Sequence, residues 1–287
     1  MTKTIKEALR WASLTLKEAG IPGYQSEGAL LLAFAMEKGL AYIYTHPREE
    51  LPGRTLERFR VLVEKRALGV PFHYLVGEKE FMGLGFKVTP GVLIPRPETE
   101  ILCQAVMDRA AEGFSKPFNL LDLCTGSGVL AVTLAKKIPQ CLAWAVDLSP
   151  EALALARENA LRHGVKEKIT FLEGDLWEPL IPLQGLTFSV IVSNPPYIPT
   201  GELAFLQREI KDHEPLLALD GGEDGLDFYH RIFCGIHDFL EPRGMAALEV
   251  GMGQIPGVMS LAAAAGFKGL EAVKDYRGIE RVLLASR

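Results

Sequence analysis

The stretch NLLDLCTGSGVLAVTLAKK, residues 119–137, decides how most of this chain folds. Three of its first five residues are leucines, on both faces of an extended chain, which is typical of a buried strand. The next residues include Gly126 and Gly128, which can adopt backbone angles that a Cβ atom disfavours. The pattern from Val129 to Lys137 favours a helix. The stretch therefore predicts a strand, a tight turn and a helix, which together form one unit of an α/β sheet.

The same alternation continues towards the C-terminus. Strands are predicted at Asn119–Leu123, Leu142–Val146, Ile169–Leu172, Phe188–Val192, Gly244–Val250 and Arg281–Ala285. Ser149 is a suitable N-cap for the helix after the second strand, and Pro150 suits its first turn. Repeated units of this kind predict a Rossmann-like, doubly wound and mostly parallel sheet with helices on both faces.

The first part of the chain has a helical pattern instead. Apolar residues recur at helical spacing from Ile5 to Leu16, and Ser26 is predicted to cap the next helix. Between residues 77 and 95 the pattern changes to short apolar runs broken by glycine and proline. The sequence thus predicts a small all-helical domain over residues 1–76, a β-hairpin linker over 77–95 and the sheet domain over 96–287.

Composition excludes several classes of protein. The formal net charge of the 287 residues is -5, which argues against a broad basic surface for nucleic acid. The four cysteines are scattered, with no zinc-like spacing to the six histidines, so we expect free thiols and no metal site. The run from Ala29 to Met36 is too short to span a bilayer. We expect a cytoplasmic monomer with no membrane contact.

Polar residues gather where the predicted strands end, which is where ligands bind in such sheets. Thr125, Gly126, Ser127 and Gly128 form the glycine-rich turn after the first strand, and Asp147 ends the second. A carboxylate at this point can accept hydrogen bonds from both hydroxyls of an adenosine ribose. These features fit either S-adenosylmethionine or a dinucleotide, since the turn also satisfies the dinucleotide fingerprint.

Two acidic residues bear on that choice. Asp122 lies at the end of the first strand, where it would repel a pyrophosphate but suit the sulfonium and amino group of S-adenosylmethionine. Asp175, after the third strand, is placed to accept from an adenine amino group, with Leu176 and Trp177 as apolar flanks. These acidic residues favour S-adenosylmethionine over a dinucleotide as the ligand, with S-adenosylhomocysteine as the product.

The segment Asn194-Pro195-Pro196-Tyr197 follows the fourth sheet strand and is the candidate catalytic element. A planar amide nitrogen has two hydrogens, which the Asn194 side-chain oxygen and the Pro195 carbonyl can accept. These acceptors stabilise positive charge that develops as the nitrogen attacks a methyl group, and they orient its lone pair. Tyr197 can cover the flat amide and exclude water. The segment therefore predicts methyl transfer to a planar nitrogen.

Over nearly its whole length the chain resembles the protein-(glutamine-N5) methyltransferases that modify peptide chain release factors. The residues that carry this resemblance are the helical domain, the segment Gly77–Glu100 with its IPRPETE element at 94–100, the glycine turn, Asp147, Asn194–Tyr197, and Glu214–Leu216 with Gly221–Leu226. Asn-Pro-Pro-Tyr alone is shared with many nucleic-acid amino-methyltransferases, whereas the IPRPETE element is much more specific to this family.

The resemblance implies a release factor as protein substrate, methylated on the glutamine of its Gly-Gly-Gln loop. It implies that Asn194 and Pro195 hold this amide, that Tyr197 covers it, and that the helical domain grips the release factor. Arg96 and Glu98 would brace the wall of the site. Cys124 departs from the family pattern, which usually has glycine there; a thiol is compatible with the turn if residue 124 stays outside the left-handed backbone region.

Two alternatives remain. One is an amino-methyltransferase acting on adenine or cytosine in DNA or RNA, which requires base flipping and phosphate contacts. The acidic net charge and the lack of a basic, aromatic-rich segment make it the less favoured enzyme. The other is a non-catalytic adenosine-binding module, against which the intact donor and acceptor motifs argue.

Overall fold

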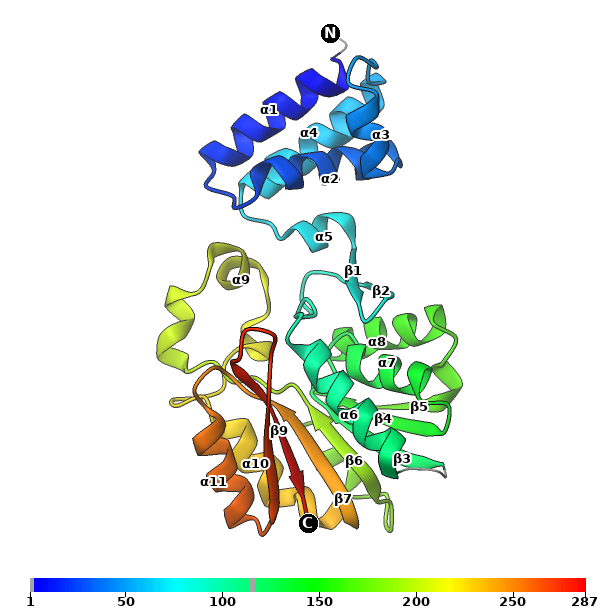
Figure 1. Cartoon of the computed structure of the whole chain (residues 1–287), viewed down its shortest axis with the longest axis vertical. Helices are drawn as coiled ribbons and strands as arrows, with labels where there is room; N and C mark the ends of the chain where they lie inside the picture. Colours follow the sequence, from blue (N-terminus) through cyan, green and yellow to red (C-terminus); the bar gives the residue numbers. More distant parts are fainter. Residues whose placement is uncertain (1–2, 114–116) are drawn as a thin grey trace. The chain divides into compact units, whose positions relative to one another are not determined.

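The computed structural model describes residues 3–113 and 117–287, and the chain divides into two compact units (Figure 1). The helical unit comprises Met1–Glu78 together with Gln207–His213. The catalytic unit comprises Lys79–Leu206 and Glu214–Arg287. The short segment at 207–213 therefore leaves the sheet domain, packs with the N-terminal helices and returns.

The helical unit is built from amphipathic helices around one apolar core. Its helices are α1 (Ile5–Glu18), α2 (Tyr24–Met36), α3 (Leu40–Thr45), α4 (Gly53–Ala67), α5 (Phe72–Val76) and α9 (Arg208–His213). Thr4 and Glu7 form a capping box at the start of α1, which satisfies backbone donors on its first turn. The predicted N-cap at Ser26 is wrong, because α2 already begins at Tyr24 after Gly23, whose φ is 64°.

Arg66 joins the two sequence segments of the helical unit. It is 2% exposed, and its guanidinium lies 2.5 Å from Glu27 of α2 and 2.8 Å from Glu209 of α9. A buried guanidinium requires such partners, because an unpaired charge in the interior is strongly destabilising. Glu209 therefore anchors the 207–213 segment to α4.

A two-stranded hairpin, β1 (Glu78–Phe81) and β2 (Leu84–Lys87), follows the N-terminal helices. Gly83 has a φ of 79° at the turn, a backbone angle that glycine adopts without strain. Phe81 and Phe86 are both fully or almost fully buried and pack edge to face, with ring centroids 6.0 Å apart. The hairpin is therefore fixed by its own aromatic side chains as well as by its turn.

The sheet of the catalytic unit has seven strands in the order β5-β4-β3-β6-β7-β9-β8. Their bounds are β3 (Phe118–Leu123), β4 (Cys141–Asp147), β5 (Ile169–Glu173), β6 (Phe188–Ser193), β7 (Leu240–Glu249), β8 (Gly269–Lys274) and β9 (Glu280–Ser286). The pairs from β5 through to β7 are parallel, whereas β9 is antiparallel to both of its neighbours. The predicted Rossmann-like, mostly parallel sheet is confirmed, but β8 was not anticipated.

Helices cover both faces of this sheet (Figure 1). One face carries α6 (Thr99–Gly113), α7 (Val129–Lys137) and α8 (Pro150–Arg162), and the other carries α10 (Asp227–Phe239) and α11 (Ile255–Ala264). The sheet has an apolar core on each face: the first lies under α6, α7 and α8, and the second under α10 and α11. Along β3, Leu120 packs in the first core and Leu121 and Leu123 pack in the second, because successive side chains of a strand point to opposite faces. The near-continuous apolar run in the sequence follows from burial on both sides.

Short 3-10 turns complete the unit at Lys166–Lys168, Glu178–Leu180, Thr200–Phe205 and Leu216–Ala218. The predicted start of α8 is confirmed: Ser149 is its N-cap and accepts a 3.1 Å hydrogen bond from the Ala152 N–H, and Pro150 lies in the first turn. None of the described helices has the length and apolar character needed to cross a membrane.

Candidate active site

A cavity of about 360 Å³ lies at the carboxyl ends of β3, β4, β5 and β6, within the catalytic unit. This volume falls within the range of small-molecule sites, roughly 300–1,000 Å³. Nine of the residues predicted for the site line the cavity: Arg96, Thr125, Gly126, Ser127, Asp147, Asp175, Leu176, Asn194 and Pro196. The other five predicted site residues do not line it: Glu98, Asp122, Gly128, Pro195 and Tyr197.

The glycine-rich turn between β3 and α7 is tightly constrained. The Thr125 N–H donates to the Val146 carbonyl at 3.0 Å, and the Gly128 N–H donates to the Thr125 carbonyl at 2.9 Å. Gly126 and Gly128 have φ values of 57° and 81°. A Cβ on Gly128 would lie only 2.9 Å from the Cβ of Ala156 in α8. Gly128 is thus required for packing behind the turn, while Gly126 faces the cavity.

Cys124 lies inside the left-handed backbone region, with a φ of 59°. The condition under which the sequence analysis accepted a thiol here is therefore not met. A residue with a Cβ in this conformation costs on the order of 1 kcal/mol relative to glycine. The side chain lines the cavity and packs against the second core, and burial raises the pKa of its thiol well above the usual range. Packing offsets part of the backbone strain.

Asp122 is fully buried behind the turn and does not line the cavity. Its Oδ2 accepts from the Thr125 hydroxyl at 2.5 Å and from the Ala131 N–H at 3.1 Å. Burial raises the pKa of this carboxyl group to about 7, against the lowering effect of both hydrogen bonds. Its position corrects the expectation of a direct donor contact, because the carboxyl group braces the turn against α7 instead.

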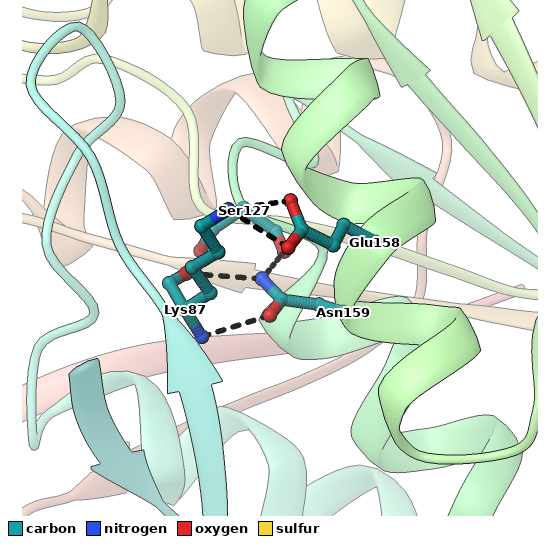
Figure 2. Close-up of polar contacts among 4 residues, drawn as sticks. All are labelled: Lys87, Ser127, Glu158 and Asn159. Carbon is teal, nitrogen blue, oxygen red and sulfur yellow. Dashed lines mark hydrogen bonds and ion pairs between the residues drawn. The ribbon is translucent and has the colours of Figure 1, made fainter. Parts of the chain in front are cut away.

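Asn159 of α8 holds the other side of the turn (Figure 2). Its Nδ2 donates to the Ser127 carbonyl at 2.9 Å and to the Lys87 carbonyl at 3.1 Å, and its Oδ1 accepts from the Lys87 N–H at 2.8 Å. The side chain is fully buried, so these three bonds replace water completely. One side chain therefore ties the last residue of β2 to the glycine turn.

Asp147 ends β4 at the cavity wall. Its Oδ2 accepts from the Gly126 N–H at 2.7 Å and its Oδ1 accepts from the Ser149 N–H at 2.9 Å. Burial raises the pKa of this carboxyl group, and the backbone donors, that of Ser149 first, oppose the shift. Three backbone donors, Ser149, Gly126 and Leu148, act on a carboxylate with about four acceptor sites, so capacity for a hydroxyl in the cavity remains.

The loop after β5 contributes Asp175 and Leu176 to the cavity, but not Trp177. Trp177 stacks on Phe239 at 5.3 Å, parallel within 4°, and so belongs to the core beside α10. The expectation that Trp177 flanks an adenine ring is wrong. Asp175 Oδ2 lies 2.6 Å from Arg231 Nη2, and both side chains are partly exposed.

Arg231 and Phe228, both on α10, line the cavity next to this loop. The Arg231 guanidinium lies 5.5 Å from the centre of the Phe228 ring. Neither residue was predicted from the sequence, because a helical pattern does not indicate which helix lines a cavity. Phe228 supplies the aromatic surface that had been expected from Trp177.

The Asn194-Pro195-Pro196-Tyr197 segment leaves β6 beside the cavity. Asn194 Nδ2 donates to the Thr99 hydroxyl at 3.1 Å. In the described parts of the chain, neither Asn194 Oδ1 nor the Pro195 carbonyl accepts a hydrogen bond. Asn194 and Pro196 line the cavity, and Pro195 is buried beside them. Among the described residues, Asn194 Oδ1 is thus an unpaired acceptor on a residue that lines the cavity, and the Pro195 carbonyl is an unpaired acceptor on the buried residue that follows it.

The backbone of Tyr197 is held by glycines of the 221–225 loop. A Cβ on Gly221 would lie 2.7 Å from the Tyr197 Cα atom, and one on Gly225 would lie 2.4 Å from the Tyr197 carbonyl oxygen. Gln254 Nε2 donates to that same carbonyl at 2.8 Å. The glycines are therefore needed for close approach, which fixes the loop that follows β6. Burial raises the pKa of the Tyr197 hydroxyl above its usual range.

Arg96 lies at the cavity edge and is paired with a buried carboxylate. Its Nη2 is 2.7 Å from Glu214 Oε1, and Glu214 Oε2 accepts from the Ile94 N–H at 3.4 Å. Glu98 is half-buried and lies outside the cavity lining. Arg96 therefore lies in the cavity wall, as expected, and is held there by Glu214, whereas Glu98 does not line the cavity. The described residues contain no cluster of three or more His, Cys, Asp or Glu side chains placed for a metal ion.

Four polar residues that support the site carry no recognisable motif of their own: Thr99, Asn159, Glu214 and Glu249. Thr99 lines the cavity, whereas the other three lie behind it, and each of the four is at most 5% exposed. A buried polar residue within an apolar pattern is the only signal they leave in the sequence, and it gives no partner. Thr99 and Glu214 are partial exceptions, because both lie in segments that carry the family resemblance.

Comparison with known proteins connects both units to one family. The description "PrmC N-terminal domain" matches residues 7–77, and "Methyltransferase small domain" matches residues 98–223. A protein of Moorella thermoacetica named release factor glutamine methyltransferase is 40% identical over 285 residues, covering 99% of each chain. A protein of the same name from Geobacter sulfurreducens is also 40% identical, covering 98% of this chain and 95% of the relative.

Solved structures share the fold at low sequence identity. A methyltransferase from Pyrococcus furiosus aligns with a TM-score of 0.52 at 19% identity, over 72% of this chain and 91% of its own. A ribosomal protein L11 methylase from Lactobacillus delbrueckii subsp. bulgaricus aligns with a TM-score of 0.50 at 20% identity, over 70% and 83%. These likenesses concern the fold alone.

Proposed function

The chain belongs to the release factor glutamine methyltransferase family, and on this premise we propose that it methylates the glutamine of a Gly-Gly-Gln loop in bacterial release factors. The transferred methyl group goes from S-adenosylmethionine to the side-chain amide nitrogen. The nucleobase alternative has no comparable support, because the relatives that match the full length are named for release factors.

The observation that carries the proposal is that Asn194 Oδ1, on a residue lining the cavity, and the adjoining Pro195 carbonyl accept no hydrogen bond from the described residues. Asn194 Oδ1 and the Pro195 carbonyl can each accept one N–H of a primary amide, which a glutamine presents in a single plane. An amide nitrogen is a poor nucleophile because its lone pair is delocalised into the carbonyl. Fixed acceptors stabilise the positive charge that grows on the nitrogen during attack, without reorganisation. Tyr197 would shield the flat amide from water.

S-adenosylmethionine is a ligand that supplies an electrophilic methyl group, and the cavity has the features that its binding requires. The turn at Gly126 leaves space beside the backbone, since a Cβ there would meet no atom within 4 Å. Asp147 keeps acceptor capacity for ribose hydroxyls, and Phe228 offers an aromatic face. Asp175 is the proposed acceptor for an adenine amino group, and its ion pair with Arg231 is partly exposed and so contributes little stability. Leu176, Thr125 and Ser127 complete this proposed donor site.

The helical unit is the proposed grip for the release factor, by analogy with the family. It has a core of its own and no predicted catalytic residue, so a binding role suits it. The cytoplasm is the corresponding place of action, because release factors act there on translating ribosomes.

A labelling experiment tests the proposal. The full chain is incubated with methyl-labelled S-adenosylmethionine and a purified release factor, then with the same factor carrying alanine in place of the loop glutamine, and with DNA and RNA. We expect label on the unaltered release factor alone, at the glutamine nitrogen by mass spectrometry. Label that appears only in nucleic acid would contradict the substrate while leaving methyl transfer in place.

A further inference from the structure

One carboxyl group contacts Tyr197, at the end of the Asn-Pro-Pro-Tyr segment, and lies next to Thr99, the partner of Asn194 at its start. Glu249 is the last residue of β7 and is 1% exposed. Its Oε1 accepts a 3.4 Å hydrogen bond from the Tyr197 hydroxyl, and the Thr99 hydroxyl also interacts with the carboxyl group. Thr99 in turn accepts from Asn194 Nδ2 at 3.1 Å. Hydrogen bonds therefore join Asn194 to Thr99 and Tyr197 to Glu249, and the Thr99 hydroxyl is close enough to the Glu249 carboxyl group to stabilise its ionised form.

Glu249 itself is held in place from the sheet. It pairs with Val282 across β7 and β9, and its backbone carbonyl accepts from the Tyr229 hydroxyl at 2.7 Å. Its Oε2 is buried and has no hydrogen-bond partner among the described residues. A buried carboxylate oxygen without a partner is costly, so its retention beside the candidate active site calls for an explanation.

We propose that Glu249, acting through Thr99 and Tyr197, is a positioning residue that orients the Asn194 side chain towards the glutamine amide. This inference rests on the proposed function. An ionised carboxylate can only accept hydrogen bonds, so a neighbouring hydroxyl must direct its hydrogen towards it. The lone pairs of Thr99 Oγ1 are then left for Asn194 Nδ2, and Asn194 Oδ1 is left for the substrate.

Reversal of the hydrogen-bond directions along Glu249, Thr99 and Asn194 would disable the site. A glutamine side chain at position 249, or the protonated acid, can donate to Thr99 as well as accept from it. The Thr99 hydroxyl is then free to donate to Asn194 Oδ1, which favours the flipped amide. A flipped Asn194 would present N–H groups to the N–H groups of the substrate, and the acceptor would be lost.

The surroundings of Glu249 make these hydrogen-bond directions sensitive to pH. Burial raises the pKa of its carboxyl group to about 7; the Thr99 and Tyr197 hydroxyls oppose the shift, Glu98 adds to it, and Arg281 opposes it. The Tyr229 hydroxyl and the Cys103 thiol also interact electrostatically with this carboxyl group. The ionised form is the one that fixes the Asn194 side chain, so turnover is expected to rise as pH increases through the neutral range.

The test compares E249Q, T99V and T99S with the unaltered chain. For each we would measure kcat, KM for the release factor, the donor Kd and the pH dependence of kcat. We expect E249Q and T99V to lower kcat by about 10- to 100-fold, the range of one lost positioning or acid–base contact, with donor Kd little changed. E249Q should also lose the rise of kcat through neutral pH, and T99S, which keeps the hydroxyl, should restore most of the turnover.

A double variant and a control sharpen the result. If Glu249 acts through Thr99, the T99V/E249Q pair should be no slower than T99V alone. Glu241→Gln, at the other end of β7, should leave the pH profile unchanged, because Glu241 bonds Ser189 instead. An E249Q enzyme with ordinary kcat and an unaltered pH profile would overturn the inference, as would additive effects in the pair. If the unaltered chain fails to methylate a release factor, the proposed function itself is wrong.

Discussion

Asn159 Nδ2 donates a 2.9 Å hydrogen bond to the carbonyl of Ser127, a residue of the turn that lines the cavity. The same amide pairs with both backbone groups of Lys87 (Figure 2). A side chain buried inside α8 thus fixes the distance between the hairpin and the proposed donor site. This arrangement can be tested separately from catalysis.

We expect Asn159→Ala to lower the free energy of unfolding by about 2–4 kcal/mol, because it leaves one buried and two partly buried backbone groups without this partner. Donor affinity should fall as the Ser127 turn loosens. The matched control is Glu158→Gln, which removes only the exposed 2.8 Å pair with Lys87 and should cost no more than about 1 kcal/mol. Urea unfolding measures the free energy of unfolding, and calorimetric titration measures donor affinity. Equal effects of the two variants would show that the Asn159 hydrogen bonds do not hold the turn.

Asn194→Ala is expected to lower kcat by about 100- to 1,000-fold, since one of two fixed acceptors is lost from the transition state. Binding of S-adenosylmethionine should persist, because the glycine turn and Asp147 are unaltered. Single-turnover methyl transfer and equilibrium donor binding separate the two effects. Asn119→Ala is the control, as Asn119 bonds the Thr187 carbonyl near the far end of the sheet and should leave turnover unchanged. Rapid turnover by the Asn194 variant would contradict the two-acceptor mechanism.

Cys124 offers a test of backbone strain. Cys124→Gly should change the free energy of unfolding by less than about 1 kcal/mol, because relief of the left-handed angle offsets the lost packing. Cys124→Val should destabilise by about 2 kcal/mol or more, since a β-branched side chain fits this region poorly. Chemical denaturation of the two variants gives the comparison, and similar stability for both would show that the φ of 59° does not matter.

The buried carboxyl group of Asp122 predicts a pH-dependent stability. The unfolded chain releases this proton near pH 4, whereas the folded chain holds it until about pH 7. Between these values the folded state binds more protons, so stability falls as pH rises. From about pH 5.5 to about pH 8 the loss due to Asp122 should be on the order of 2 kcal/mol.

Asp122→Asn should remove that part of the pH dependence, as measured by urea unfolding at both pH values. Asp275→Asn serves as the control. Hydrogen bonds from the backbone, that of Ile279 first, lower the pKa of Asp275, so its contribution is complete above about pH 4 and constant over the same range. If the unaltered chain and Asp122→Asn respond alike to pH, Asp122 is ionised in the folded protein throughout.

The fold was largely predictable because its signals are local. The turn at Gly126 and Gly128, the cap at Ser149 and the apolar run before Cys124 each determine their own conformation from neighbouring residues. Edge strands carry weaker signals: β8 is half-exposed and has no continuous apolar run, and it was missed. Ser26 failed as a cap because Gly23, with its left-handed angle, already ends the preceding turn.

The site was predictable only where a motif meets the cavity. Asn194, Asp147 and the glycine turn could be named because their place at strand ends fixes their direction. Trp177 and Phe228 could not be told apart, since either aromatic residue could have faced the ligand and only packing of α10 decides. Thr99 and Glu249 are separated by 150 positions in sequence, so only the assembled sheet brings them together.

The excursion at Gln207–His213 has a consequence for how this protein can be divided. The chain passes between its units after Glu78, after Leu206 and after His213, so no single cut separates them. A fragment that starts at Lys79 would retain Glu209 but lose the buried Arg66 that holds it. The loop that runs on from Tyr197 would then end in an unanchored stretch. Genetic exchange or engineering that swaps only the first 78 residues would therefore need a compatible insert at 207–213, and we expect the two segments to be inherited as one.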